Sequence, residues 1–401
     1  MNDVVQTMMN CIKYEIRGQK ERENVVLPEV SVRFLTELYK LAKAHDVAHL
    51  VGDALNKCGA FNNLPDTTEE NERATISKIK AKFDEQVFTA VYRYENINYE
   101  LEQIKQAFNE AKIPFIPLKG SVIRKYYPEP WMRTSCDIDI LVKEEDLDKA
   151  VKVLTEKKDF KQDGKRNFHD ISLYSPAGIH LELHFNIKET VEKLDAVLET
   201  AWEHAAKKEN CENEYEYKFS AEFFLFHLYA HSSYHFVSGG CGVRPFLDLY
   251  LLNKKIKYDR EKLNALLEEA GIKKFAEEVE HLAETWFGEL EYTNLTRRIE
   301  EYILNGGVYG TLENRVAVEQ GKQGKFGYAL SRIWLPYKTL KFRYPSLEKH
   351  KWLLPFYEIR RWVAILFDGG VKRGSNELKV NANLSDEKKQ AAKRLIDELG
   401  L

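Results

Sequence analysis

The sequence predicts an α+β fold in which a small mixed β-sheet is flanked by helical regions on both sides along the chain. Short alternating runs typical of strands are confined to residues 111–212. Apolar residues spaced by three and four dominate residues 1–110 before them and 213–366 after them. Residues 367–401 begin with a Gly-rich and polar stretch, so we interpret them as a linker and a terminal helix.

Two stretches of the N-terminal region carry a helical period. The first is "SVRFLTELYKLAKAHDVAHLVGDALNKCG", and the second is "KIKAKFDEQVFTAVYRYENINYELEQIKQAFNEAKI". The polar segment "NNLPDTTEENER" at 62–73 lies between them and predicts a loop. The N-terminal region is therefore expected to form amphipathic helices.

The central region alternates between strand and helix patterns. The helical "EEDLDKAVKVLTEKKDF" and the turn "SPAG" separate runs that predict strands at 114–118, 136–142, 168–174 and 179–187. After residue 213 the helical period returns in "AEFFLFHLYAHSSYHF", "RPFLDLYLLNKKI", "KLNALLEEAG", "KKFAEEVEHLAETWFG" and "LLPFYEIRRWVAILF". A last helix is predicted at 386–399.

The overall composition permits an enzyme and excludes few classes of protein. The 401 residues are 44% hydrophobic, which is ample for packed cores, and the net charge of −3 gives no sign of a nucleic-acid footprint. Five cysteines at scattered spacings, with no CxxC pair, favour a reducing compartment over a disulfide framework. The N-terminal residues lack a secretion signal, and no run of about 18 apolar residues occurs. We therefore expect a cytoplasmic protein without a membrane partner.

Two aspartates interrupt the apolar strand pattern "CDIDILV". Successive side chains on a strand point to opposite faces, so Asp137 and Asp139 share one face while Ile138, Ile140 and Val142 fill the other. Two neighbouring carboxylates repel each other unless a cation lies between them. The pair therefore indicates a metal site, and the alternative is the polar outer face of an antiparallel sheet.

A Lys-Gly-Ser turn precedes these aspartates. In "PLKGSVIRKYY", Gly120 and Ser121 end the first strand and can open a helix. A glycine lets backbone amides approach a ligand, and a helix N-terminus presents free N–H groups, so the turn suits a phosphate. Lys119 can add a positive charge. An ordinary strand-to-helix turn is the alternative.

A third carboxylate follows in "GIHLELHFN". Leu181, Leu183 and Phe185 share one face, while His180, Glu182 and His184 occupy the opposite one. Three carboxylates from neighbouring strands form an oxygen site that suits Mg²⁺ or Mn²⁺ and leaves coordination positions for substrate phosphates. His184 can assist proton transfer or hold a carboxylate, although a strand histidine can equally be packed or solvated.

These motifs resemble those of the polymerase-β-like nucleotidyltransferase superfamily. Gly120-Ser121, Asp137-Ile138-Asp139 and Leu181-Glu182-Leu183 are similar to its glycine-serine turn, Asp-x-Asp pair and third acidic strand. More narrowly, the chain resembles a bacterial family of uncharacterised nucleotidyltransferases over roughly residues 30–365. "AHSSYHFVSGGCGVRPFLDLY" is similar to that family's helix with two histidines, its glycine-rich bend and its Arg-x3-Asp, which here are His231, His235, Arg244 and Asp248.

The spacing between Gly120 and Asp137 is longer than in compact members of the superfamily. The segment from Tyr126 to Arg133 is therefore an insertion, and a substrate-contacting loop is one interpretation. Arg133 can neutralise phosphate charge, and the alternative is a solvent-exposed arginine.

Three histidines recur every four residues in the helical stretch after residue 221. His227, His231 and His235 would form a stripe on one helix face, able to bind a transition metal or close over the active site. The alternative is packing within an apolar helix. Arg244 and Asp248 lie at i and i+4, so they can also form a simple intrahelical ion pair.

The resemblance and the residues agree on metal-assisted attack at a nucleotide phosphate. Asp137, Asp139 and Glu182 are the predicted catalytic and metal-binding residues, while Lys119, Gly120, Ser121 and Arg133 are the predicted nucleotide-binding residues. The expected substrates are an NTP, with ATP the expected one, and an unidentified acceptor hydroxyl. Two other functions stay open: a catalytically inactive nucleotide-binding or scaffold protein, and a toxin-like enzyme that modifies RNA or protein.

Overall fold

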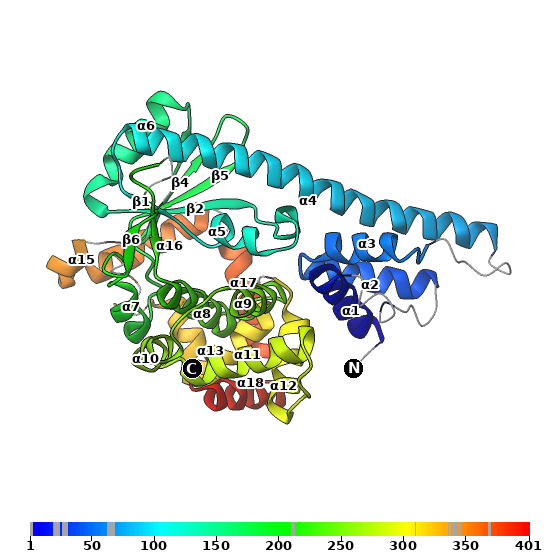
Figure 1. Cartoon of the computed structure of the whole chain (residues 1–401). Coiled ribbons are helices and arrows are strands. Elements are labelled where there is room, and N and C mark those ends of the chain that lie inside the picture. Colours follow the sequence, from blue (N-terminus) through cyan, green and yellow to red (C-terminus); the bar gives the residue numbers. More distant parts are fainter. Residues whose placement is uncertain are drawn as a thin grey trace.

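The computed structural model describes residues 3–18, 25, 31–61, 69–164, 166–209, 213–308, 310–335, 337, 340, 344, 346–367 and 370–401. Most of the predicted loop at 62–73 lies outside these residues. Its last part belongs to a helix, because α4 begins at Glu70. Within the described residues the α+β fold class is confirmed, with a five-stranded sheet and helical regions before and after it (Figure 1).

Helices form most of the described N-terminal region, as the apolar periodicity predicts. They are α1 (Asp3–Arg17), α2 (Val32–Ala44), α3 (Ala48–Lys57) and α4 (Glu70–Glu110). Ser31 caps α2, because its Oγ accepts a hydrogen bond from the Phe34 amide at 3.2 Å. The 41-residue α4 extends from the N-terminal helices to the sheet (Figure 1). It therefore joins the N-terminal helices to the core.

The sheet has the order β1-β2-β5-β4-β3. β2 is antiparallel to β1 and parallel to β5, while β4 is antiparallel to both β5 and β3. The four predicted strands are confirmed, with slightly shorter bounds: β1 (Phe115–Pro117), β2 (Asp137–Val142), β4 (Asp170–Tyr174) and β5 (His180–His184). Three further strands of three residues each were not predicted, namely β3 (Lys161–Asp163), β6 (Ala205–Lys207) and β7 (Tyr217–Phe219).

The two faces of the sheet have different neighbours. One face carries Ile138, Ile140, Leu181 and Leu183, which share a buried core with the C-terminal half of α4 and with α6 (Leu147–Lys157). The burial of this face leaves the alternate residues of β2 and β5 on the other face. The acidic residues lie on that second face, away from α4 and α6.

Helices make up most of the described residues beyond the sheet. Their bounds are α5 (Gly120–Ile123), α7 (Glu192–Leu198), α8 (Ala221–Val237), α9 (Arg244–Lys255), α10 (Arg260–Glu269), α11 (Lys273–Phe287), α12 (Asn294–Gly306), α13 (Leu312–Ile333), α15 (Ser346–Lys349), α16 (Leu354–Phe367), α17 (Gly370–Asn383) and α18 (Asp386–Leu399). Short 3-10 turns lie at Arg124–Tyr126, Pro130–Met132, Glu144–Asp146 and Lys351–Leu353. Among the described residues, no helix combines the length and the apolar character needed to cross a bilayer.

The prediction of a loose linker after residue 366 is wrong for the part that the structure describes, because α17 covers most of it. Tertiary contacts stabilise this Gly-rich helix against α13. Glu377 of α17 pairs with Arg315 at 3.0 Å and with Arg332 at 2.9 Å. The buried Asn381 Oδ1 accepts a hydrogen bond from Gln320 Nε2 at 2.6 Å. Contacts between distant segments thus outweigh the low helix propensity of the sequence.

Candidate active site

Three carboxylates lie on the open face of the sheet, as the alternation of the two strands predicts. In the β2–β5 register, Asp139 lies opposite Glu182 and Asp137 lies opposite His180. The shared face of Asp137, Asp139 and Glu182 is therefore confirmed, while their chemical roles stay predictions. The pairing is parallel, so the antiparallel outer face that we considered as the alternative does not describe these two strands.

Asp139 is buried and has two cationic partners. Its Oδ1 lies 3.0 Å from Lys119 Nζ and 3.0 Å from His184 Nε2. Burial alone would raise the pKa of Asp139, but Lys119 and His184 hold it well below its usual range. Burial opposes the charge on His184, yet its bonds to Asp139 and Glu182 raise its pKa to about 9. The positive charge that the carboxylates require thus comes from side chains of this chain.

Asp137 and Glu182 form the more accessible part of the site. Burial and the neighbouring charges of Asp139 and Glu182 raise the pKa of Asp137. Ligand atoms of Asp137, His180 and Glu182 lie within 4.8 Å of one another, and so do those of Asp139, Glu182 and His184. Glu182 belongs to both groups. His180 is a candidate ligand that we did not select from the sequence, although the alternation places it on this face.

The Lys-Gly-Ser turn borders the same face. Lys119 has φ 40° and ψ −118°, a backbone conformation that favours glycine, and it precedes the four-residue α5. A Cβ added to Gly120 would lie 3.3 Å from the Ser135 Cβ and Oγ, so the absence of a side chain lets the turn pack on the segment before β2. The buried Ser121 Oγ has no hydrogen-bond partner among the described residues. Its hydrogen-bonding capacity is therefore unused within the described residues.

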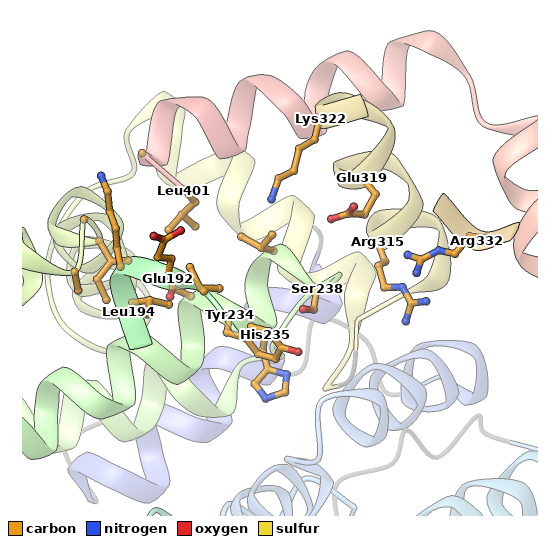
Figure 2. Close-up of a pocket in the computed structure, with 18 residues that line it drawn as sticks. Glu192, Leu194, Tyr234, His235, Ser238, Arg315, Glu319, Lys322, Arg332 and Leu401 are labelled. Carbon is orange, nitrogen blue, oxygen red and sulfur yellow. The ribbon is translucent and has the colours of Figure 1, made fainter. Parts of the chain in front are cut away.

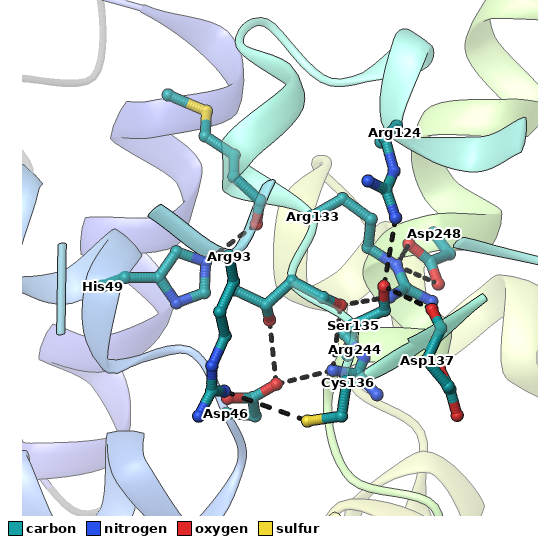
Figure 3. Close-up of polar contacts among 12 residues, drawn as sticks. Asp46, His49, Arg93, Arg124, Arg133, Ser135, Cys136, Asp137, Arg244 and Asp248 are labelled. Atoms are coloured by element: carbon teal, nitrogen blue, oxygen red, sulfur yellow. Dashed lines mark hydrogen bonds and ion pairs between the residues drawn. The ribbon is translucent and has the colours of Figure 1, made fainter. Parts of the chain in front are cut away.

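Arg133 is buried, so the alternative of a solvent-exposed arginine is wrong. Its Nε donates to Asp248 Oδ1 at 2.7 Å and to Oδ2 at 2.9 Å (Figure 3). Tyr127 Oη donates to the same Oδ1 at 2.7 Å. These bonds fix the inserted segment to α9. The predicted contact of Arg133 with phosphate stays a prediction, because its charge is already paired here.

Arg244 and Asp248 do not form the intrahelical pair that their spacing allows. Arg244 Nη1 instead lies 2.6 Å from Asp46 Oδ2, which also accepts from Thr134 Oγ1 at 2.8 Å. The reason is that each residue has a partner on another segment: the partly buried Asp46, in the turn between α2 and α3, pairs with Arg244, and the buried Arg133 pairs with Asp248. The Arg-x3-Asp motif therefore joins α9 to the N-terminal helices and to the segment before β2 (Figure 3).

A further arginine lies beside the start of β2. Arg93 of α4 is exposed, and its Nη1 lies 3.8 Å from the Sγ of the exposed Cys136, the residue before Asp137 (Figure 3). The charge of Arg244 also acts on Asp137, because it opposes the rise in the pKa of that carboxyl, which burial and the neighbouring carboxylates cause. Sequence reasoning missed Arg93, since nothing distinguishes it from the other cations of α4 before the helix is placed against β2.

The three histidines of α8 pack as a stripe beside the site. The ring centroids of His231 and His235 lie 4.4 Å apart, and His231 Nδ1 lies 2.7 Å from Glu189 Oε1. Burial and then the charge of Lys119 lower the pKa of His231 well below its usual range, which favours an uncharged imidazole in this contact. The metal-ligand groups found among the described residues include none of these histidines. The packing interpretation is therefore favoured.

A cavity of about 920 Å³ lies beside the C-terminal end of this stripe (Figure 2). Tyr234, His235 and Ser238 of α8 line it, together with Arg315 and other residues of α13, the start of α7 and the turn between α10 and α11. Its volume suits a nucleotide-sized molecule. His235, in contact with His231, connects this cavity to the neighbourhood of Glu189.

Comparison with known families gives one match. A family model described as uncharacterised nucleotidyltransferase matches residues 35–288, which is more than half of the chain. The chain belongs to this family. The matched residues include every predicted site residue, but they end before residue 365, the limit that we expected. Neither the curated proteins nor the solved structures include a match.

The donor set fits the divalent ions on which nucleotidyl transfer generally depends. Asp137, Asp139 and Glu182 supply hard oxygen ligands, which Mg²⁺ and Mn²⁺ prefer over nitrogen. His180 and His184 add nitrogen ligands, which Mn²⁺ accepts more readily than Mg²⁺. This nucleotidyltransferase therefore carries side-chain clusters that are compatible with metal binding.

Proposed function

We propose that the chain is a metal-dependent nucleotidyltransferase that moves a nucleoside monophosphate from an NTP to an acceptor hydroxyl. The observation that carries this proposal is the β2–β5 register, which brings Asp137, Asp139 and Glu182 together beside the Lys-Gly-Ser turn. In a member of a nucleotidyltransferase family, this arrangement supports the family reaction more strongly than it supports an inactive scaffold.

In the proposed reaction, the acceptor oxygen forms a bond to the α-phosphorus of the NTP. The bond from that phosphorus to the bridging oxygen of the β-phosphate breaks, and pyrophosphate leaves. The hydroxyl proton passes to a carboxylate of the open face, for which we propose Glu182. A divalent ion held by Asp137, Asp139 and Glu182 would supply Lewis-acid stabilisation of the phosphate charge.

The surrounding side chains position the triphosphate. Ser121 Oγ is buried without a partner and can donate to a phosphate oxygen. Arg93 beside Cys136 and Arg244 near Asp137 place positive charge at the start of β2. Since phosphoryl transfer depends mainly on positioning and charge stabilisation, this turn and these cations supply what the reaction requires of the protein.

The cavity beside α8 is proposed as the binding site of the acceptor. It is large enough for a small molecule, and His235 in its wall is linked through His231 to Glu189. Burial raises the pKa of Glu189 while the charges of Lys119 and His184 oppose that rise, so the contacts that lead from the cavity through His231 end at a carboxyl within electrostatic reach of the catalytic face. An acceptor held there would reach the carboxylates from the side of α8.

A labelling experiment tests the proposed reaction. The purified chain is incubated with each α-labelled NTP, Mg²⁺ or Mn²⁺ and a cell extract. Metal-dependent transfer of label to an acceptor is expected, with ATP the expected donor. The variant with Asp137→Asn and Asp139→Asn should lose both the transfer and the Mg·NTP affinity measured by calorimetry, while its circular dichroism spectrum stays unchanged.

The same experiment separates the alternatives. Label on RNA or protein would favour the toxin-like function. Mg·NTP binding without transfer under every condition would favour an inactive nucleotide-binding protein. Unchanged Mg·NTP affinity in the double variant would show that the carboxylate site is misassigned.

A further inference from the structure

Exposed apolar side chains are concentrated on two helical segments of the C-terminal region. Phe326, at 80% exposure, and Trp352, at 76%, are the extremes. The exposed residues of α13 and of the segment 351–363 are spaced by three and four, so each set lies on one helix face. These residues are Phe326, Leu330, Ile333, Trp334, Trp352, Phe356, Ile359, Trp362 and Val363.

The two sets lie next to each other at the end of α13. Arg361 Nη2 donates to the Ile333 carbonyl at 2.6 Å, and Trp362 Nε1 donates to the same oxygen at 3.1 Å. The Leu335 amide donates to Glu358 Oε1 at 2.7 Å. These bonds fix the end of α13 to α16, so the two apolar sets adjoin at Ile333 and Trp362. We call the nine residues the α13–α16 surface.

The size of this surface requires an explanation. At about 100 Å² each, nine half-exposed large side chains present on the order of 900 Å² of apolar area. The largest apolar patch on a typical monomer measures about 300–600 Å². One side of a stable protein interface buries about 800 Å². The α13–α16 surface is therefore large enough to be a docking surface.

Positive charge accompanies the apolar residues. The sequence from 336 to 374 contains nine Lys and Arg against three Asp and Glu, in a chain whose net charge is −3. Between residues 346 and 363, the exposed ionic side chains that the structure describes are Lys349, Lys351 and Arg360, whereas Glu358 is buried. Cations thus border the apolar face, and none of these three forms an ion pair with a described carboxylate.

The positive charge beside the α13–α16 surface indicates which kind of partner binds there. A second copy of the chain would bring the same cations together across a symmetric contact, and like charges repel there. Single-stranded nucleic acid stacks on aromatic rings, but Leu330, Ile333, Ile359 and Val363 offer no ring. An anionic lipid surface accepts aliphatic and tryptophan side chains at the level of the headgroups, and it attracts Lys and Arg.

We infer that the α13–α16 surface docks on an anionic lipid membrane. Contact of this kind is peripheral, because the described residues contain no membrane-crossing helix. The inference revises our sequence-based expectation of no membrane partner. It is independent of the proposed reaction, since none of the predicted catalytic or nucleotide-binding residues belongs to the surface.

Vesicle flotation of the full chain tests the inference. Vesicles of phosphatidylcholine alone are compared with vesicles that also contain phosphatidylglycerol. The wild-type chain should float with the anionic vesicles and much less with the neutral ones, and added salt should weaken its binding. The variant with Lys351→Glu and Arg360→Glu should bind at least about 25-fold more weakly, at about fivefold for each lost cation. The variant with Trp352→Ser and Phe356→Ser should also lose binding.

Two matched controls lie outside the surface. Phe88→Ser removes an exposed ring from α4, and Lys149→Glu reverses an exposed charge on α6, so both variants should float like the wild type. Equal losses in the controls, or no flotation of the wild type, would overturn the inference. A dimer in analytical ultracentrifugation that Trp352→Ser abolishes, without vesicle binding, would assign the surface to a second copy. Binding of labelled single-stranded RNA that the charge variant abolishes, again without vesicle binding, would assign it to nucleic acid.

Discussion

The ion pair between Lys119 and Asp139 gives the sharpest test of the site. Lys119→Met keeps the length of the side chain and a residue with a Cβ, so the unusual backbone conformation of the turn is unchanged. It removes the ammonium that lies 3.0 Å from Asp139 Oδ1. Asp139 would then lie buried among Asp137 and Glu182 with His184 as its remaining cationic partner. We expect the variant to be less stable than the wild type when metal is absent.

The size of the loss follows from the burial of the pair. The side chains of Lys119 and Asp139 are 20% and 6% exposed, and breaking a buried pair costs about 3–5 kcal/mol. His184 retains its bond to Asp139, so the lower end applies. At about 2.1 cal/mol/K per residue for a 401-residue chain, a loss of about 3 kcal/mol corresponds to roughly 4 °C in the unfolding temperature.

Thermal unfolding followed by circular dichroism measures this loss, first with EDTA and then with Mg²⁺ or Mn²⁺. A bound cation replaces the missing charge, so metal should raise the unfolding temperature of the variant more than that of the wild type. Lys125→Met is the matched control, because Lys125 is exposed and its removal should change stability by about 0.5 kcal/mol or less. If Lys119→Met unfolds at the wild-type temperature with EDTA, or if metal stabilises both proteins equally, the assigned role of Lys119 is refuted.

Three more predictions concern the reaction, the cavity and the N-terminal helices. Glu182→Gln should lower the rate of labelled transfer by about 10²–10³-fold with Mg·NTP affinity nearly unchanged, and wild-type turnover would contradict its role. Ser238→Trp fills the cavity and should reduce transfer to the acceptor, whereas a loss of Mg·NTP affinity would show that the cavity holds the nucleotide. Burial raises the pKa of Glu15 from 4.5 to about 7, so its contribution to stability is greatest below pH 4.5 and is lost as pH rises through 7. The free energy of unfolding of Glu15→Gln, measured with denaturant, should therefore rise by about 1–2 kcal/mol relative to that of the wild type as the pH increases from 5 to 8. This figure allows for the half-exposed partner Lys57. A difference between the two proteins that does not change with pH would contradict this reasoning.

The sequence was most informative where the pattern has a period of two. The alternation in β2 and β5 determines which residues share a face, so the grouping of Asp137, Asp139 and Glu182 could be predicted without knowledge of the neighbouring strands. The direction of the pairing was not predictable in this way. Parallel and antiparallel neighbours place the same side chains on the same face, and the connection through β3 and β4 decides between them.

Contacts between distant segments were the main source of error. The spacing of Arg244 and Asp248 allowed a pair within one helix, but Asp46 and Arg133 are their partners, and they lie far away in the sequence. The same limit explains why Arg93 was missed and why α17 was predicted to be a linker. In each case the deciding group is brought near by the fold, and local spacing carries no information about it.

The backbone of Lys119 connects the turn to the chemistry. A residue other than glycine at φ 40° is strained, at a cost of about 1–3 kcal/mol, and such strain persists where the surrounding structure holds it. Here the strained residue carries the ammonium that pairs with Asp139, and the cost of leaving that buried carboxylate without the ammonium, about 3 kcal/mol, is comparable to the strain or larger. The amine is therefore paired with a carboxylate when no nucleotide is bound. Once a cation neutralises Asp139, the same amine lacks a partner while lying beside the Gly120-Ser121 turn, where a phosphate would supply one. We accordingly expect Lys119→Met to weaken NTP binding in calorimetry when Mg²⁺ is present, and an unchanged affinity would restrict Lys119 to its structural pair with Asp139.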